Sequence, residues 1–205
     1  VWRVLGAADE ARRDYDAALA LCRQIGSRLL EGHALLGLAS VQRELARYAE
    51  ASDLCEQAVD LFRELELTDG LADALGSLGA LLDEAGRPEE ARQTLAEALQ
   101  VQDARTFTAD VALRRCRLAA VGGLGAEDAL AAYEAARPTA GFLQRMSMLH
   151  LLWRTSGEVR CLDQAWTLLR KLRADAPAPW RAAMVECVRM HRDIKADYER
   201  AHASV

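Results

Sequence analysis

Residues 46–62, "ARYAEASDLCEQAVDLF", and residues 86–102, "GRPEEARQTLAEALQVQ", carry alanines and large apolar residues at the same relative positions. The pattern begins earlier in the chain, so that Ala11, Ala51 and Ala91 stand at intervals of forty residues. A fixed interval of this length is typical of repeat architectures, in which each unit buries its apolar face against its neighbours. The repeat therefore indicates the fold class before any single motif is considered.

Within each unit the apolar residues follow the helical period. Leu54, Ala58, Leu61 and Leu65 recur at steps of three and four, as on one face of an α-helix. The two halves of a unit are separated by turn sequences, and in one of them Pro88 occupies a position suited to the first turn of a helix. Each unit is therefore predicted to be two helices, and the chain to be all-α.

Small residues at fixed places predict how the two helices of a unit pack. Antiparallel helices approach closely only where the facing side chains are small. We expect Ala51 to face Ala39, and Ala91 to face Gly79 in the next unit. A large residue at any of these positions would push the helices apart.

The motifs "LGLAS…Y-AEA…C-EQA", from residue 36, and "LGSLGA…G-PEEA…L-AEA", from residue 75, resemble the tetratricopeptide repeat. The resemblance implies a right-handed α-solenoid of antiparallel helix hairpins, with the first helices lining a concave groove that holds a protein or peptide. The forty-residue unit is similar to the long-helix variant in kinesin light chains. It is also similar to the variant in C-terminal regions of large bacterial signalling proteins, including ATPase-type regulators and Ser/Thr kinases.

The register predicts one solenoid domain made of consecutive segments. These are a truncated first repeat over 1–30, repeats over 31–70 and 71–108, divergent repeats over 109–138 and 139–176, and a capping helix over 177–205. The opening residues "VWRVLGAADEA" align with the end of a first helix, so we expect a piece of a longer protein whose remainder lies N-terminal. A bare first unit exposes apolar surface and could pair with a second copy as a homodimer.

The resemblance also implies where a partner would lie. Carried over by register, the groove residues are His33, Leu36, Arg43, Asp73, Asp83 and Glu84 from the regular repeats, and Arg114, Leu118, His150 and Arg154 from the divergent ones. This groove is expected to run from acidic to basic. A clamp for a C-terminal carboxylate, which the family builds from Lys, Arg and Asn, is not expected, because the chain contains no Asn and Leu36 and Gly76 occupy clamp positions.

No constellation of residues indicates catalysis. The four histidines are not in metal-ligand spacings, and the five cysteines include no CxxC pair, so buried free thiols are expected. We therefore predict no enzyme activity, no metal and no cofactor.

Composition narrows the partners further. The 205-residue chain is 51% hydrophobic with a net charge of −5, and acidic residues dominate its first half and basic residues its second. Nucleic acid is disfavoured because no basic helix stripe carries interleaved aromatics. No apolar run is long enough for a membrane span and no signal sequence is evident, so a cytoplasmic location is expected. The leading hypothesis is a protein- or peptide-binding scaffold or sensor module within a bacterial signalling protein; the alternatives are a self-association module and a small-molecule effector-binding domain.

Overall fold

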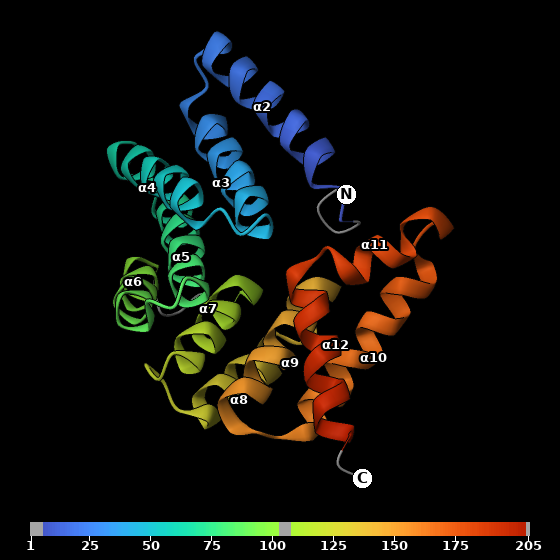
Figure 1. Cartoon of the computed structure of the whole chain (residues 1–205). Coiled ribbons are helices and arrows are strands. Elements are labelled where there is room, and N and C mark those ends of the chain that lie inside the picture. Colours follow the sequence, from blue (N-terminus) through green and yellow to red (C-terminus); the bar gives the residue numbers. More distant parts are fainter. Residues whose placement is uncertain (1–5, 103–107, 204–205) are drawn as a thin grey trace. The chain divides into compact units, whose positions relative to one another are not determined.

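The computed structural model describes residues 6–102 and 108–203, and within these ranges every regular element is a helix. The prediction of an all-α fold built from successive helix pairs is confirmed (Figure 1). The chain divides into two compact bodies, each with its own internal packing. We call them the N-terminal body, described from Ala8 to Gln102, and the C-terminal body, described from Thr108 to Ala203 together with Gly6 and Ala7.

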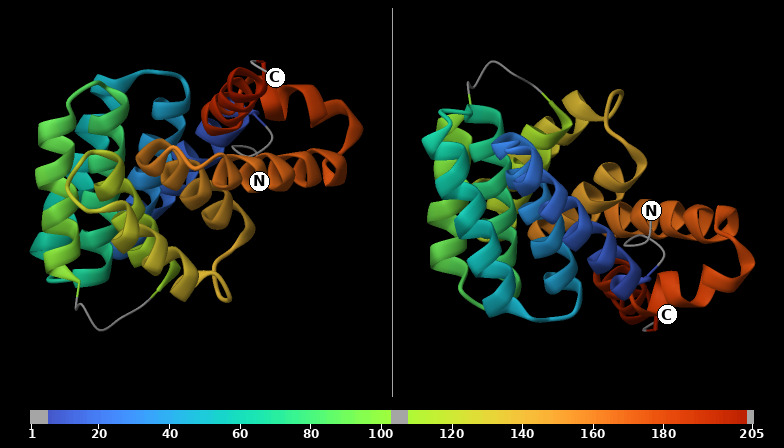
Figure 2. Two further views of the ribbon diagram at one scale, coloured as in Figure 1. Left: turned by 90° about the horizontal axis from the view of Figure 1, so that it is seen from below. Right: turned by 90° about the horizontal axis from the view of Figure 1, so that it is seen from above.

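The N-terminal body consists of five consecutive helices. They are α2 (Ala8–Ile25), α3 (Arg28–Glu44), α4 (Tyr48–Glu64), α5 (Thr68–Glu84) and α6 (Pro88–Val101). Each helix packs against the next, and α3 also contacts α5 (Figure 2). Consecutive helices from α3 onward begin twenty residues apart, so a helix pair repeats every forty residues. The interval found in the sequence is thus the length of two helices with their turns.

The turns between these helices share one backbone conformation. The first residue after α2 and the second residue after α3, α4 and α5 have a positive φ, at Gly26 (71°), Ala46 (57°), Glu66 (54°) and Gly86 (77°). An amide then donates to the carbonyl oxygen five residues earlier, as from Arg47 to Gln42 and from Arg87 to Leu82, both at 2.9 Å. This bond closes the last helical turn and satisfies a carbonyl that the helix end leaves open.

The repeated small residues lie where the helices touch. Ala51 and Ala91 have no exposed surface, and Ala11 retains only 3%. A Cβ added to Gly79 would lie 2.6 Å from Cγ of Leu95 and 3.4 Å from the carbonyl oxygen of Ala91. The predicted contact of Ala91 with Gly79 is therefore present, and it leaves no room for a side chain.

Phe62 sets the spacing between α3 and α5. Its ring, from α4, has no exposed surface and lies between Gly32 of α3 and Gly70 of α5. A Cβ on either glycine would come within 2.5 Å of a ring carbon. The two first helices of successive repeats are thus held on either side of one aromatic ring.

The C-terminal body repeats the helix-pair arrangement with shorter and less regular helices. They are α7 (Ala109–Ala120), α8 (Ala126–Ala136), α9 (Phe142–Ser156) and α10 (Val159–Asp175). Tyr133, Met146, Met148 and Leu169 lie among its most deeply buried side chains. Because these are larger than the alanines of the N-terminal body, the packing here depends on individual side-chain shapes more than on a repeated small position.

The end of the chain differs from the prediction of one capping helix over 177–205. The structure has a 3₁₀ turn η1 (Ala178–Trp180), then α11 (Arg181–Glu186) and α12 (Arg189–His202). The break comes at Val188, whose backbone is extended, with ψ of 114°. His191 fits the break, because its Nδ1 lies 2.8 Å from the carbonyl oxygen of Met184 and donates to it at the end of α11. Periodicity alone could not show this side-chain cap.

The predicted boundaries at 30/31 and 70/71 fall in the first turns of α3 and α5, and those at 108/109, 138/139 and 176/177 fall between helices. Residues 1–5, on which the truncated first repeat partly rests, lie outside the described residues. The expectation of one continuous right-handed solenoid over both bodies stays a prediction.

Candidate functional site

The candidate binding face in the N-terminal body lies on α3 and α5. It comprises the six predicted residues His33, Leu36, Arg43, Asp73, Asp83 and Glu84, and we call it the α3/α5 face. All six reach solvent: His33 and Asp73 are exposed and the other four are half-buried. His33, Leu36 and Arg43 follow the helical period on α3, whereas Asp83 and Glu84 are consecutive residues in the last turn of α5.

One contact ties the two helices together across this face. Nε of Arg43 lies 3.6 Å from Oε2 of Glu84, so an ion pair joins the last turn of α3 to the last turn of α5. Both side chains are half-buried, so dissolved ions screen the attraction between them less than they would screen a pair on an open surface. The pair joins the one arginine of the face to one of its three acidic side chains.

The predicted basic end of the groove is not an open surface. Arg114, Leu118 and His150 are buried, with 3%, 6% and 8% of their surface exposed. Only Arg154 is exposed. Placing Arg114, Leu118 and His150 in an accessible groove was therefore wrong, because the register of the regular repeats does not carry into helices with different packing.

His150 instead belongs to a buried polar cluster inside the C-terminal body. Its Nε2 lies 2.7 Å from Oδ2 of Asp197, which joins α9 to α12. Arg200 also hydrogen-bonds Asp197, and the ring of Trp153 stacks on that of His150 with centroids 5.8 Å apart. Burial lowers the pKa of His150 and outweighs the carboxylate of Asp197, which raises it. This arrangement holds α12 in place and leaves the imidazole inaccessible to a partner.

Two clefts were not predicted. One, of about 380 Å³, opens in the N-terminal body between α2, α3 and α4. Its apolar lining includes Leu19, Leu35, Leu38 and Leu54. Arginine, aspartate and glutamine side chains also line it, so its charge indicates no ligand class.

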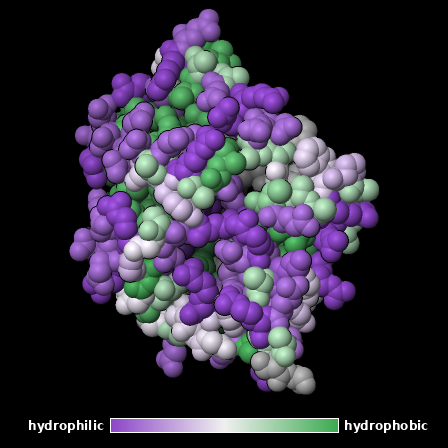
Figure 3. All heavy atoms as spheres, viewed as in Figure 1, coloured by the Kyte–Doolittle hydropathy of each residue, from purple (hydrophilic) through white to green (hydrophobic). Residues whose placement is uncertain are grey.

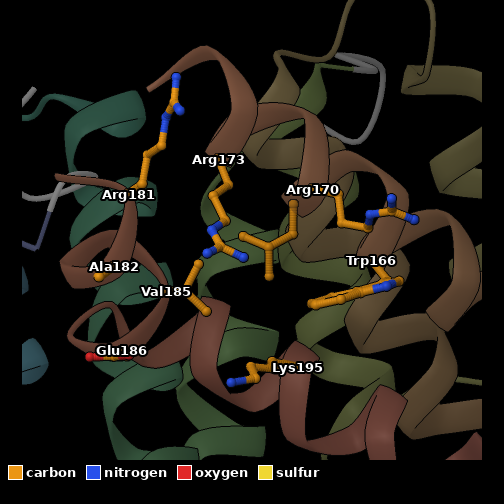
Figure 4. A pocket seen from close by; sticks show the side chains of 9 residues that line it. Trp166, Arg170, Arg173, Arg181, Ala182, Val185, Glu186 and Lys195 are labelled. Atoms are coloured by element: carbon orange, nitrogen blue, oxygen red, sulfur yellow. The ribbon is translucent and has the colours of Figure 1, made fainter. Parts of the chain in front are cut away.

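The second cleft, of about 160 Å³, lies between α10, α11 and α12 in the C-terminal body (Figure 4). Basic side chains from α10 and α12 surround it, notably Arg170, Arg173 and Lys195. Sequence reasoning missed it because these residues come from helices whose packing the sequence did not predict. The one available sign was the basic run "RKLR" over 170–173.

The potential metal ligands of the described residues are dispersed, and four of the five cysteines are buried. No group of three or more His, Cys, Asp or Glu among them is placed to hold a metal ion. Burial raises the pKa of both Cys55 and Cys116 to about 12. Cys22 and Cys161 are also buried, whereas Cys187 is exposed, which corrects the expectation that all five thiols are buried. A search of the described helices for one long and apolar enough to cross a membrane found none.

Comparison with known proteins agrees with the geometry. The family model described as tetratricopeptide repeat matches residues 3–64 and 32–104. The solved crystal structure of BtubC (BKLC) from P. vanneervenii matches with a TM-score of 0.56 at 16% identity, covering 97% of this chain and 88% of that one. At that identity the likeness concerns the fold alone. No curated protein matches the sequence.

Proposed function

The chain belongs to the tetratricopeptide repeat family through residues 3–104, and we propose that it is a non-catalytic scaffold whose α3/α5 face holds a protein or peptide. Repeats of this family generally mediate protein–protein interactions. The observation that carries the proposal is the α3/α5 face itself, where six side chains reach solvent on two helices that Phe62 holds at a fixed spacing. A rigid, preorganised face loses little conformational entropy when a partner binds.

The charge of the face defines the partner class within this proposal. Asp73, Asp83 and Glu84 outnumber the single arginine, Arg43, which is paired with Glu84. Acidic surfaces speed the encounter with basic partners and select against acidic ones. The partner we propose is therefore a segment rich in Lys or Arg, with apolar side chains that can contact Leu36.

An array of short synthetic peptides that differ in net charge tests this proposal. We expect basic peptides to bind the full chain, and the double substitution Asp73→Lys with Asp83→Lys to weaken binding about tenfold or more, as for lost charge pairs. Asp53→Lys is the matched control, because Asp53 is an exposed acidic residue on α4, outside the face. Equal binding of acidic and basic peptides, or equal loss in the control, would contradict the proposal.

Self-association is the second candidate function, and a specific observation favours it. Leu21 and Ile25 of α2 are 56% and 62% exposed, whereas Leu61, forty residues after Leu21, is 6% exposed. Leu29 and Leu30 extend the exposed apolar surface beyond the turn. Hydrophobic side chains accordingly reach the surface at the top of the face drawn in Figure 3, over α2 and α3. Exposed apolar patches of this kind mark interaction sites.

Light scattering over a range of concentrations tests self-association. We expect the mass to rise toward that of a dimer, and Leu21→Glu with Ile25→Glu to keep the protein monomeric. Because both side chains are exposed, these substitutions should leave the melting temperature unchanged at low concentrations, where the wild type is also a monomer. A strict monomer at the highest concentration would exclude this candidate.

The setting we propose is a larger bacterial signalling protein in the cytoplasm. The support is the forty-residue unit, which resembles the long-helix repeats of such proteins. An effector domain encoded in the same reading frame is the expected finding, and a reading frame without one would contradict this setting. Binding of a small-molecule effector inside the superhelix remains the third alternative.

A further inference from the structure

The cleft between α10, α11 and α12, which we call the α10–α12 cleft, combines an apolar floor with a basic rim. Leu169 and Val185 form part of the floor and are 1% and 7% exposed, and Trp166 stands beside them, half-buried. Figure 4 shows the side chain of Arg173 reaching across toward Val185, with Lys195 below it. Apolar and cationic groups thus meet in one small hollow.

The cations of the rim differ in what they already bind. Arg181 is engaged, because its guanidinium donates to the carbonyl oxygens of Ala176 and Ala174 at the end of α10. Lys195 has only a distant carboxylate, with its Nζ 3.9 Å from Oε1 of Glu199.

Arg170 and Arg173 occupy successive turns of α10 on the rim of the cleft. Neither has a carboxylate within 4.0 Å among the described residues. Arg173 and Lys195 therefore have little compensation in the cleft, whereas the guanidinium of Arg170 extends toward Trp166 and away from that of Arg173 (Figure 4). Glu186 is the single acidic residue among those lining it.

We propose that the α10–α12 cleft binds a small phosphomonoester, with the phosphate on Arg173 and Lys195 and an apolar substituent over Leu169 and Val185. The lining carries four cations, Arg170, Arg173, Arg181 and Lys195, against the single Glu186, and this excess of positive charge favours a phosphate dianion over a carboxylate. Guanidinium groups present paired donors that fit phosphate oxygens. The apolar floor, made of side chains that also belong to the hydrophobic core, suits a ligand with an apolar substituent beside the phosphate.

The volume limits what the ligand can be. Sites for drug-sized molecules occupy roughly 300–1,000 Å³, and the α10–α12 cleft offers about 160 Å³. It has room for a phosphate and one ring or short chain, while a larger ligand would extend into solvent. The inference is independent of the α3/α5 face, so failure of one leaves the other standing.

Calorimetry on the full chain with phenyl phosphate as the probe tests the proposal. We expect saturable binding that Arg173→Gln and Lys195→Gln each weaken about tenfold or more, because each substitution removes a charge-assisted hydrogen bond to the phosphate. Arg160→Gln and Lys171→Gln are the matched controls, because both residues are exposed on α10 and neither lines the cleft. The controls should bind phenyl phosphate as the unmodified chain does.

Further ligands separate the two parts of the site. Inorganic phosphate should bind more weakly than phenyl phosphate, because it lacks the apolar group, and benzoate should bind more weakly, because it carries one charge. Absence of saturable binding, equal binding of benzoate, or equal losses in the controls would overturn the proposal. Tighter binding of a phosphotyrosine peptide than of phenyl phosphate would overturn the assignment to a small molecule.

Discussion

Ala46 and Glu66 lie twenty residues apart and hold the same left-handed backbone conformation, with φ of 57° and 54°. Gly26 and Gly86 occupy the equivalent turns at 71° and 77°. The two kinds of residue differ in cost, because a Cβ strains this conformation by roughly 1–2 kcal/mol. The turn geometry is therefore kept even where the sequence does not supply glycine.

Replacing Ala46 by Gly should stabilise the protein. The substitution removes the Cβ strain but adds backbone freedom to the unfolded chain, so we expect a net gain of about 0.5–1 kcal/mol. Urea unfolding measures it. Gly86→Ala is the reverse control and should lose a similar amount, since no atom lies near enough to its added Cβ to clash and only the backbone is strained. A loss of stability in Ala46→Gly would contradict this account of the turn.

Ala51→Leu should destabilise the N-terminal body. Ala51 is fully buried at the contact between α3 and α4, and overpacking of a close contact costs about 1–3 kcal/mol. The midpoint of urea unfolding gives the change. Ala49→Leu, two residues away on the same helix and exposed, should leave the midpoint nearly unchanged. If both substitutions had the same effect, the small position would have no special role in packing.

The regular repeats could be predicted from sequence because one spacing encodes them. The positions of Ala51 and Ala91 fix which helix faces meet, and the turns at Ala46 and Gly86 fix where helices end. Both the small-residue positions and the turn positions depend on nearby residues alone, and both recur every forty residues. The same register then placed the α3/α5 residues at solvent-reaching positions on the first helices.

The C-terminal body could not be predicted in the same way. Burial of His150 depends on Asp197, forty-seven residues further along the chain, and the break before α12 depends on the contact of His191 with Met184. Neither contact can be predicted from a repeated spacing in the sequence. The α10–α12 cleft was missed for the same reason. Arg173 and Lys195 come near each other because α10 packs against α12, and no repeated spacing in the sequence predicts that packing.

The cysteines should differ sharply in reactivity. With a pKa of about 12, the thiols of Cys55 and Cys116 are ionised in roughly one molecule in ten thousand at a pH of about 8. Cys187 is exposed. We therefore expect one rapidly modified thiol in the native protein when a disulfide reagent is added, and five after denaturation. Cys187→Ser should abolish the rapid phase; a rapid phase that survives would show that a buried thiol is accessible.

Stability should fall in mild acid because of His150. Burial lowers its pKa below the usual value near 6.5, against the opposing effect of Asp197, so the unfolded chain binds the proton more readily than the folded one. The contribution of His150 is therefore fully present above about pH 6.5 and is lost as the pH falls from there to the lowered pKa of the folded state. Arg154 also lowers this pKa, while Asp193 raises it.

Urea unfolding of the wild type and His150→Gln across this range measures the effect. Glutamine keeps a donor for Asp197 but does not titrate, so the variant should lose less stability than the wild type between about pH 7.5 and pH 5.5. His150→Ala removes the donor and should cost about 1.5–3 kcal/mol at neutral pH. His33→Gln, at an exposed position, should keep the pH dependence of the wild type. Identical pH dependence in His150→Gln and the wild type would show that the buried imidazole is not the titrating group.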